Sequence, residues 1–272
     1  MNRMLQYMAY ADDVVLIARN SQTLKDAFKQ LDEGSTNIGL SINENKTKYL
    51  ASSRTRQIGE RFMECNNYKF ERVKDFKYLG SVITEDNNVE VDIKAKIAAG
   101  NRCYYALSQY LRSRTLSRKI KIQIYETVIK PVVLYGAETW VLTKKDEDLL
   151  SIWERKILRR IYGPVCIDGE WRIRSNQELR DLYKKLPIVH ELKVRRLSWL
   201  GHVERMNDSR AVKRVFRENP GGRRLKGRPR KRWLEDVEDD LRKIGVRGWR
   251  RKAADREEWR GILEEAKALN GL

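Results

Sequence analysis

Apolar and polar residues alternate in short runs along the first part of the chain. Residues 5–10 and 14–18 are β-prone runs separated by Ala11, Asp12 and Asp13, a pattern that predicts a hairpin with two acids at its tip. In residues 21–34 the apolar positions recur at helical spacing, which predicts a helix capped by Ser21 and stopped by Gly34.

Further strands are expected at residues 39–43 and 47–51, followed by a second hairpin at 76–84 that bends at Gly80. Beyond residue 86 the apolar residues recur mainly at helical spacing. The helices are expected at residues 89–111, 117–129, 146–162, 176–185, 188–204, 232–244 and from about 256 onward. Pro131 interrupts this pattern, since proline removes a backbone donor.

The helix at 146–162 has the clearest amphipathic pattern. Thr143 and Asp146 have the spacing of a capping box, and Gly163 follows the last turn. One face is apolar, with Leu150, Trp153, Ile157 and Ile161, and the opposite side is basic, with Arg155, Lys156, Arg159 and Arg160. We interpret these four cations as candidate phosphate contacts.

Charge is distributed unevenly along the 272 residues. Residues 1–100 hold 15 basic and 14 acidic side chains, whereas the remaining 172 hold 42 and 24, out of a total net charge of +19. A strongly basic region favours a polyanionic partner, namely nucleic acid. The alternative is that charge only keeps a polar helical protein in solution. No apolar run approaches the roughly 20 residues of a membrane helix, so no membrane partner is expected.

The composition of residues 218–232 predicts a flexible linker, because glycine and proline interrupt regular structure there. Its basic residues are Arg223, Arg224, Lys226, Arg228, Arg230, Lys231 and Arg232. Residues 226–230 resemble an AT-hook, which lies in a narrow A·T-rich minor groove. A nuclear-localisation signal and a nonspecific phosphate tether use the same residue types. The five acids of residues 235–240 are expected to pair with nearby arginines.

The most specific chemical feature is Tyr10-Ala11-Asp12-Asp13 between two apolar runs. Adjacent carboxylates on a hairpin offer the hard oxygen ligands that Mg²⁺ prefers. An acidic, solvated turn is the alternative interpretation. Three cysteines and two histidines show no zinc-ligand spacing.

This segment resembles the catalytic hairpin of a reverse transcriptase palm. Gly39-Leu40-Ser41-Ile42-Asn43 and the residues up to Thr47 are similar to the next palm block, and residues 76–83 to the primer-grip hairpin. Leu134-Tyr135-Gly136-Ala137-Glu138-Thr139-Trp140, residues 159–163, 199–206 and 227–233 resemble the thumb and downstream region of LINE-like, non-LTR retrotransposons. Members of that family are often called endonuclease-reverse transcriptases.

The resemblance implies a role for each matching residue. Asp12 and Asp13 would bind Mg²⁺, and Lys46 would lie near the triphosphate, unless it is an ordinary surface lysine. The primer end would be held by Phe76, Lys77, Tyr78, Leu79 and Gly80. The resemblance also implies an RNA template and a DNA primer or target as partners. It implies an intracellular, nuclear location.

The chain also departs from the family pattern. A third palm aspartate, the fingers and an upstream endonuclease domain precede the hairpin in that family, and we expect this chain to lack them. Loss of a metal-binding carboxylate should cost orders of magnitude in rate. We therefore expect the C-terminal part of an RNA-directed DNA polymerase that is nearly inactive alone, or a non-catalytic nucleic-acid-binding module.

The expected fold class is α+β. An incomplete palm would occupy residues 1–86, a helical thumb residues 87–165, and a basic helical C-terminal region residues 166–272.

Overall fold

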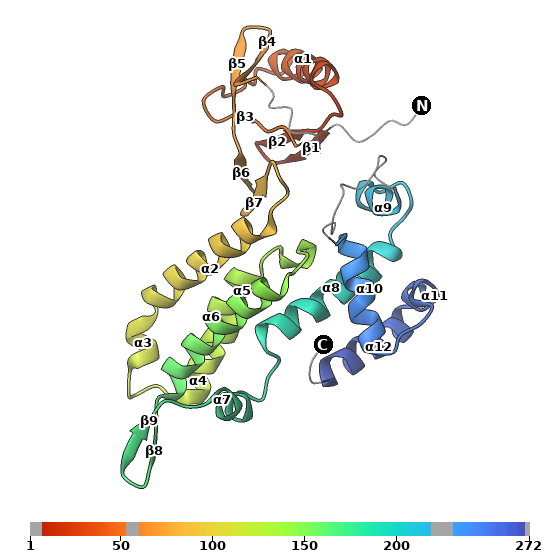
Figure 1. Ribbon diagram of the computed structural model, residues 1–272. Coiled ribbons are helices and arrows are strands. Elements are labelled where there is room, and N and C mark those ends of the chain that lie inside the picture. Colours follow the sequence, from red (N-terminus) through yellow and green to blue (C-terminus); the bar gives the residue numbers. More distant parts are fainter. Residues whose placement is uncertain (1–6, 53–59, 219–230, 270–272) are drawn as a thin grey trace. The chain divides into compact units, whose positions relative to one another are not determined.

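The computed structural model describes residues 7–52, 60–218 and 231–269. It divides into two compact units, Met1–Asn88 (unit 1) and Val89–Leu272 (unit 2), shown in Figure 1. Unit 1 combines one helix with small sheets and unit 2 is almost entirely helical, so the fold is α+β.

Unit 1 is built from seven short strands and one helix in its described residues. These are β1 (Tyr7–Tyr10), β2 (Asp13–Leu16), α1 (Ser21–Asn37), β3 (Lys48–Tyr49), β4 (Phe62–Cys65), β5 (Tyr68–Arg72), β6 (Asp75–Tyr78) and β7 (Ser81–Thr84). β1 pairs with β2 and β6 with β7, both antiparallel. The third sheet has the order β3-β5-β4, with β3 parallel to β5.

The core of unit 1 lies between α1 and the β3-β5-β4 sheet. Phe28 of α1 meets Phe70 edge-on, with ring centroids 5.0 Å apart. Met63 and Cys65 complete the buried cluster, and Leu16 of β2 packs against it. Among the described residues, Leu16 thus connects the β1–β2 hairpin to this core.

Unit 2 contains eleven α-helices among its described residues, with one π-helical and one 3₁₀ segment and a small hairpin. They are α2 (Val89–Ala106), α3 (Ser108–Arg112), α4 (Arg118–Ile124), η1 (Tyr125–Ile129), α5 (Lys130–Leu134), η2 (Ala137–Thr139), α6 (Lys144–Tyr162), β8 (Val165–Ile167), β9 (Glu170–Arg172), α7 (Asn176–Tyr183), α8 (Ile188–Glu204), α9 (Ala211–Arg217), α10 (Trp233–Lys243), α11 (Trp249–Ala254) and α12 (Arg256–Ala268).

Helix α8 takes part in both hydrophobic cores of unit 2. Its first turns, with Ile188 and Leu192, join the core formed by α2 to α7. Its later residues, with Leu197 and Leu200, join the core formed with α10, α11 and α12. The indole N–H of Trp259 on α12 donates to the Leu197 carbonyl over 3.1 Å. Helix α8 is therefore the element shared by the two halves of this unit (Figure 1).

Several predicted elements are confirmed. Both predicted hairpins of unit 1 form, and α8 has the predicted bounds. Thr143 and Asp146 make the predicted capping box at the start of α6, and Gly163 caps its end. Helix α6 buries the four predicted apolar residues.

Other predictions are wrong in detail. Asn20, not Ser21, caps α1, because its side chain accepts from the Thr23 N–H, and the helix continues past Gly34 to Asn37. Residues 39–43 form no strand. Gly39 has a φ of +76° there, and the Asn43 side chain accepts from the Lys46 N–H. These local turns replace the expected strand.

Pro131 does not interrupt the helical path. It lies in the first turn of α5, directly after the π-helical η1. The Lys130 N–H bonds to the Tyr125 carbonyl five residues back. This wider turn accommodates a residue that has no N–H to donate.

Candidate functional site

The two adjacent aspartates occupy the tip of the β1–β2 hairpin. Tyr10 and Asp13 are paired across the strands, so Ala11 and Asp12 form a two-residue turn. Ala11 has a φ of +52°, in the left-handed region that such hairpin turns require. Asp12 and Asp13 are both exposed. The predicted acidic tip is therefore confirmed as a structural feature.

The hairpin also exposes apolar side chains. Its exposed residues include Tyr7, Met8, Tyr10, Val14 and Ile17. Tyr10, next to the acidic turn, is 68% exposed. The β1–β2 pair forms a two-stranded sheet with no third strand among the described residues. Its Leu16 end packs against the unit 1 core.

The donor set at this tip fits part of a magnesium site. Neither the Asp12 nor the Asp13 side chain makes a hydrogen bond or ion pair within the described part of the chain, so their carboxylate oxygens are available. Mg²⁺ is commonly held by one or two carboxylates together with substrate phosphates and water. The described residues contain no group of three or more His, Cys, Asp or Glu side chains that could hold a metal. A third carboxylate is therefore not found beside this pair there.

Lys46 lies in an exposed turn between α1 and β3. Its backbone N–H donates to Asn43 Oδ1 over 3.1 Å, and Thr47 Oγ1 donates to the Asn43 carbonyl over 2.8 Å. Ile42, just before this turn, packs on the same core as Leu16 of the hairpin. No hydrogen bond or ion pair between described residues joins Lys46 to either aspartate.

The primer-grip-like residues 76–80 form strand β6 and its turn. Leu79 and Gly80 have φ values of +45° and +83°, the pair of left-handed residues that defines a type I′ hairpin turn. Lys77 and Leu79 are exposed. This hairpin is a separate sheet from β1–β2, and the two share unit 1 but no strand pairing.

The four candidate cations of α6 do not share one environment. Arg159 is already engaged in hydrogen bonds within the protein: its Nε donates to the Arg174 carbonyl and its Nη2 to Asn176 Oδ1. Lys156 and Arg160 are exposed, and neither has an ion-pair partner among the described residues. Arg155 is half-buried. Lys156 and Arg160 are thus the fully exposed cations of this group and the most accessible to phosphate.

Most candidates in the basic linker lie outside the described residues. These are Arg223, Arg224, Lys226, Arg228 and Arg230, and with them the AT-hook-like segment 226–230. Lys231 is paired with Asp239, which raises the pKa of Lys231. Arg232 is the N-cap of α10, and its backbone N–H donates to Glu235 over 3.0 Å.

Three of the five acids of α10, Asp236, Asp239 and Asp240, pair with basic residues as predicted, whereas Glu238 accepts from the Trp249 indole N–H. Arg196 of α8 is 1% exposed and forms ion pairs with Asp236 at 2.5 Å and with Asp240. Its Nη1 also donates to the Trp140 carbonyl. Asp236 and Asp240 lie four residues apart, on one face of the helix. They fix α10 against α8.

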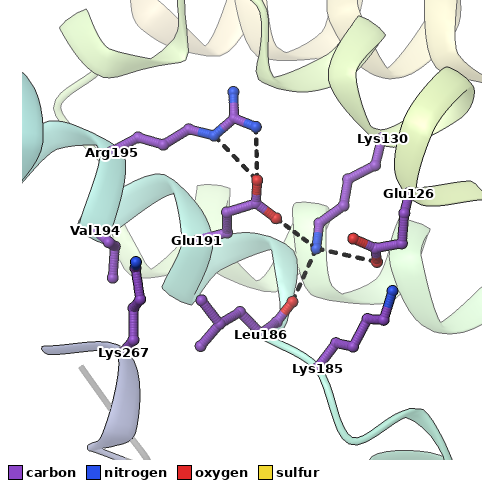
Figure 2. A pocket seen from close by; sticks show the side chains of 8 residues that line it. All are labelled: Glu126, Lys130, Lys185, Leu186, Glu191, Val194, Arg195 and Lys267. Atoms are coloured by element: carbon purple, nitrogen blue, oxygen red, sulfur yellow. Dashed lines mark hydrogen bonds and ion pairs between the residues drawn. The ribbon is translucent and has the colours of Figure 1, made fainter. Parts of the chain in front are cut away.

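A buried lysine was not foreseen from the sequence. Lys130 donates to the Leu186 carbonyl over 2.8 Å and forms ion pairs with Glu191 at 2.6 Å and Glu126 at 3.5 Å. Figure 2 shows these groups converging on the ammonium. Burial raises the pKa of Glu191, but Lys130 and Arg195 outweigh it and hold the pKa below its ordinary value.

These groups line a cavity of about 530 Å³. Its wall also includes Lys185 and Lys267 (Figure 2). Deeper in, burial raises the pKa of Glu154, and Tyr125 donates to that carboxylate over 2.9 Å. The only sequence signal was a lysine between apolar helical positions. Lys130 also donates to the Tyr183 hydroxyl of α7. The polar groups of this network are directed at one another, so its role is to hold α5, α7 and α8 together.

Comparison with known proteins gives two findings. Residues 1–83 match the family "Reverse transcriptase (RNA-dependent DNA polymerase)", a stretch that contains the β1–β2 hairpin and all of the β6–β7 hairpin except Thr84. The whole chain is similar to a putative uncharacterized transposon-derived protein of Caenorhabditis elegans. The two are 25% identical over 268 residues, 96% of this chain and 96% of that protein. No solved structure matches the chain.

Residues 1–83 are therefore reverse-transcriptase-like, and the similarity to a transposon-derived protein extends through unit 2. This supports the resemblance proposed from Tyr10-Ala11-Asp12-Asp13. Separately, none of the described helices has the length and apolar character needed to cross a membrane.

Proposed function

We propose that this protein derives from the reverse transcriptase of a LINE-like, non-LTR retrotransposon of the endonuclease-reverse transcriptase type, and that it binds RNA and DNA. The observation that carries the proposal is the position of the aspartate hairpin inside the stretch that matches reverse transcriptases. In this proposal residues 1–86 are a palm remnant, 87–165 a thumb and 166–272 a basic C-terminal region.

The proposed chemistry belongs to unit 1. Asp12 and Asp13 would hold Mg²⁺, which when bound would neutralise phosphate charge during nucleotidyl transfer. Lys46 would lie by the triphosphate, and residues 76–80 by the primer end. Each carboxylate is exposed, and its side chain is unpaired within the described residues, so its oxygens are available to a metal.

We further propose that the chain polymerises slowly or not at all by itself. Two carboxylates at an exposed tip leave most of the coordination to water and substrate. The described residues supply no third acidic or histidine ligand. Because electrostatic stabilisation dominates phosphoryl transfer, this should lower the rate by orders of magnitude.

Charge supports a second candidate, a nucleic-acid-binding module without turnover. Unit 1 has 13 basic and 12 acidic side chains, whereas unit 2 has 44 and 26, a net charge of +18. Binding by such a surface releases counterions and weakens steeply with salt. Both candidates predict this binding, so only a catalytic assay separates them.

The decisive experiment is primer extension on an RNA template with Mg²⁺. It compares the wild type, the Asp12→Asn/Asp13→Asn variant and a control, Asp26→Asn, which changes an exposed aspartate of α1. We expect little or no extension by any of them, with tight template-primer binding at low salt. Extension that the double variant alone abolishes would overturn the inactivity proposal. Failure of the wild type to bind template-primer would overturn the nucleic-acid function itself.

A further inference from the structure

The β8–β9 hairpin of unit 2 presents an exposed apolar face. Val165 pairs with Arg172 and Cys166 with Trp171, so Cys166, Trp171 and the following Ile173 lie on one side. Trp171 is 72% exposed and Ile173 75%. Large apolar side chains that cluster at such exposure mark interaction surfaces. The hairpin projects beyond the helices of unit 2, near α7 (Figure 1).

Polar contacts fix the base of the hairpin. Arg174 Nε donates to the Gly163 carbonyl over 3.1 Å, and Arg159 of α6 donates to the Arg174 carbonyl. Arg172 makes a two-pronged ion pair with Glu178 of α7, both bonds 2.8 Å long. The indole is therefore carried on a strand tied to two helices, so little conformational freedom is lost when a ligand binds.

The charge beside this face is positive. Residues 155–174 contain six basic and two acidic side chains. Arg160 and Lys156 are exposed on the last turns of α6. The two acids lie elsewhere: Asp168 is in the turn, and Glu170 pairs with Ile167 on the opposite side. Trp171 is three residues from Arg174, whose carbonyl Arg159 of α6 contacts, so about 10 Å of extended chain separates Trp171 from this contact with the last turns of α6.

We propose that Trp171 is a stacking platform for an unpaired base of single-stranded nucleic acid, with Ile173 beside it and Arg160 and Lys156 on neighbouring phosphates. The inference rests on the proposed nucleic-acid function. A flat exposed ring offers a π-face that any base can cover. A duplex hides the faces of its bases, so this surface favours a single strand. Positive charge beside the ring distinguishes it from a purely apolar protein contact.

The test is fluorescence anisotropy with a labelled 15-nucleotide single strand and a 15-base-pair duplex. Trp171→Ala is expected to weaken single-strand binding by about 5- to 100-fold and duplex binding by less than about 2-fold. Trp171→Phe should keep most of the affinity. Tyr105→Ala is the matched control, because Tyr105 is 67% exposed on α2 of the same unit, and it should change neither affinity. Arg160→Ala should weaken both ligands and reduce the salt dependence.

The outcomes separate the inference from the function on which it rests. Unchanged single-strand affinity in Trp171→Ala, with binding intact in the wild type, overturns the stacking role alone. An equal loss for single strand and duplex overturns it as well. A protein contact would appear as self-association in sedimentation that Trp171→Ala abolishes without altering either affinity, and this too overturns the proposal. A wild type that binds neither ligand overturns both proposals.

Discussion

Unit 1 and unit 2 differ in whether they bury charged side chains. Among the described residues, unit 1 buries no charged side chain and relies on a core of four residues. Unit 2 buries six cations and five anions beneath cores of nineteen and eleven residues. Small cores cannot enclose an ion pair, since removing both charges from water is costly. Large helical packing surfaces can, as where Arg196 meets Asp236 and Asp240.

The comparison also bears on nucleic-acid binding. The buried cations and anions of unit 2 differ by only one charge, so burial removes almost none of its net +18. Unit 1, close to neutral, carries the exposed aspartates instead. The proposed chemistry and the proposed electrostatic attraction thus reside in different units.

The largest effect should follow from Arg196→Ala. This change leaves Asp236 and Asp240 buried without their shared cation, and breaking such a pair costs about 3–5 kcal/mol. Urea unfolding followed by far-UV circular dichroism measures the loss. Arg247→Ala, an exposed arginine of the same unit, should shift stability by less than about 0.5 kcal/mol. Equal shifts in the two variants would mean that the buried ion pairs of α8 do not hold unit 2 together.

Phe28→Ala tests whether unit 1 depends on its small core. The ring packs on Phe70 and Tyr68, and its loss should cost about 3 kcal/mol, since half-exposed neighbours can partly fill the space. Hydrogen exchange should rise in β4 and β5 and remain at the wild-type rate in α6 and α8. Ile17→Ala, at an exposed position, is the control. Faster exchange throughout unit 2 would contradict independent stability of the two units.

Gly201→Ala probes the tightest helix contact of unit 2. A Cβ there would overlap the buried indole of Trp259, with Cε2 at 2.8 Å, and such overpacking costs about 1–3 kcal/mol. Gly261→Ala is the matched control on α12, where a Cβ meets nothing within 4 Å, and it should stabilise by up to about 1 kcal/mol. Thermal unfolding of both variants measures whether each substitution lowers or raises the stability. A stabilising Gly201→Ala would show that α12 can move away from α8.

Sequence patterns predicted the elements of this fold better than their environments. Period-2 and period-3.6 signals were sufficient for the β1–β2 hairpin and for α6, because capping residues and turns act locally. They failed at residues 39–43, where a side-chain bond of Asn43 decides the conformation. They also failed at Pro131, where the preceding π-helical turn accommodates a residue that has no N–H to donate.

The candidate site shows the same limit. Asp12 and Asp13 could be located from sequence because strands and turn define their positions. The hydrogen bonds of Arg159 to Arg174 and Asn176 could not be predicted from sequence, because these partners lie fifteen and seventeen residues away along the chain. Tertiary partners decide which cations of an amphipathic helix remain available. The exposure of Trp171 belongs to the same class of information, because a tryptophan in a short strand is more often buried.

The smallest expected effect concerns an exposed ion pair of unit 2 and its pH dependence. Hydrogen bonds from Arg172, and from the Ser175 N–H, lower the pKa of Glu178 to about 2, below the ordinary 4.5. A carboxyl whose pKa is lowered by folding stabilises above the unfolded value and loses that contribution as pH falls through the folded value. Protection of the β8–β9 hairpin against hydrogen exchange should therefore decline between about pH 4.5 and pH 2. In Glu178→Gln it should be lower at pH 5 and vary less with pH, whereas Glu257→Gln on α12 should match the wild type. A Glu178→Gln variant with the wild-type pH profile would show that the hairpin is held by its backbone contacts alone, which would remove one of the two supports for a rigid Trp171.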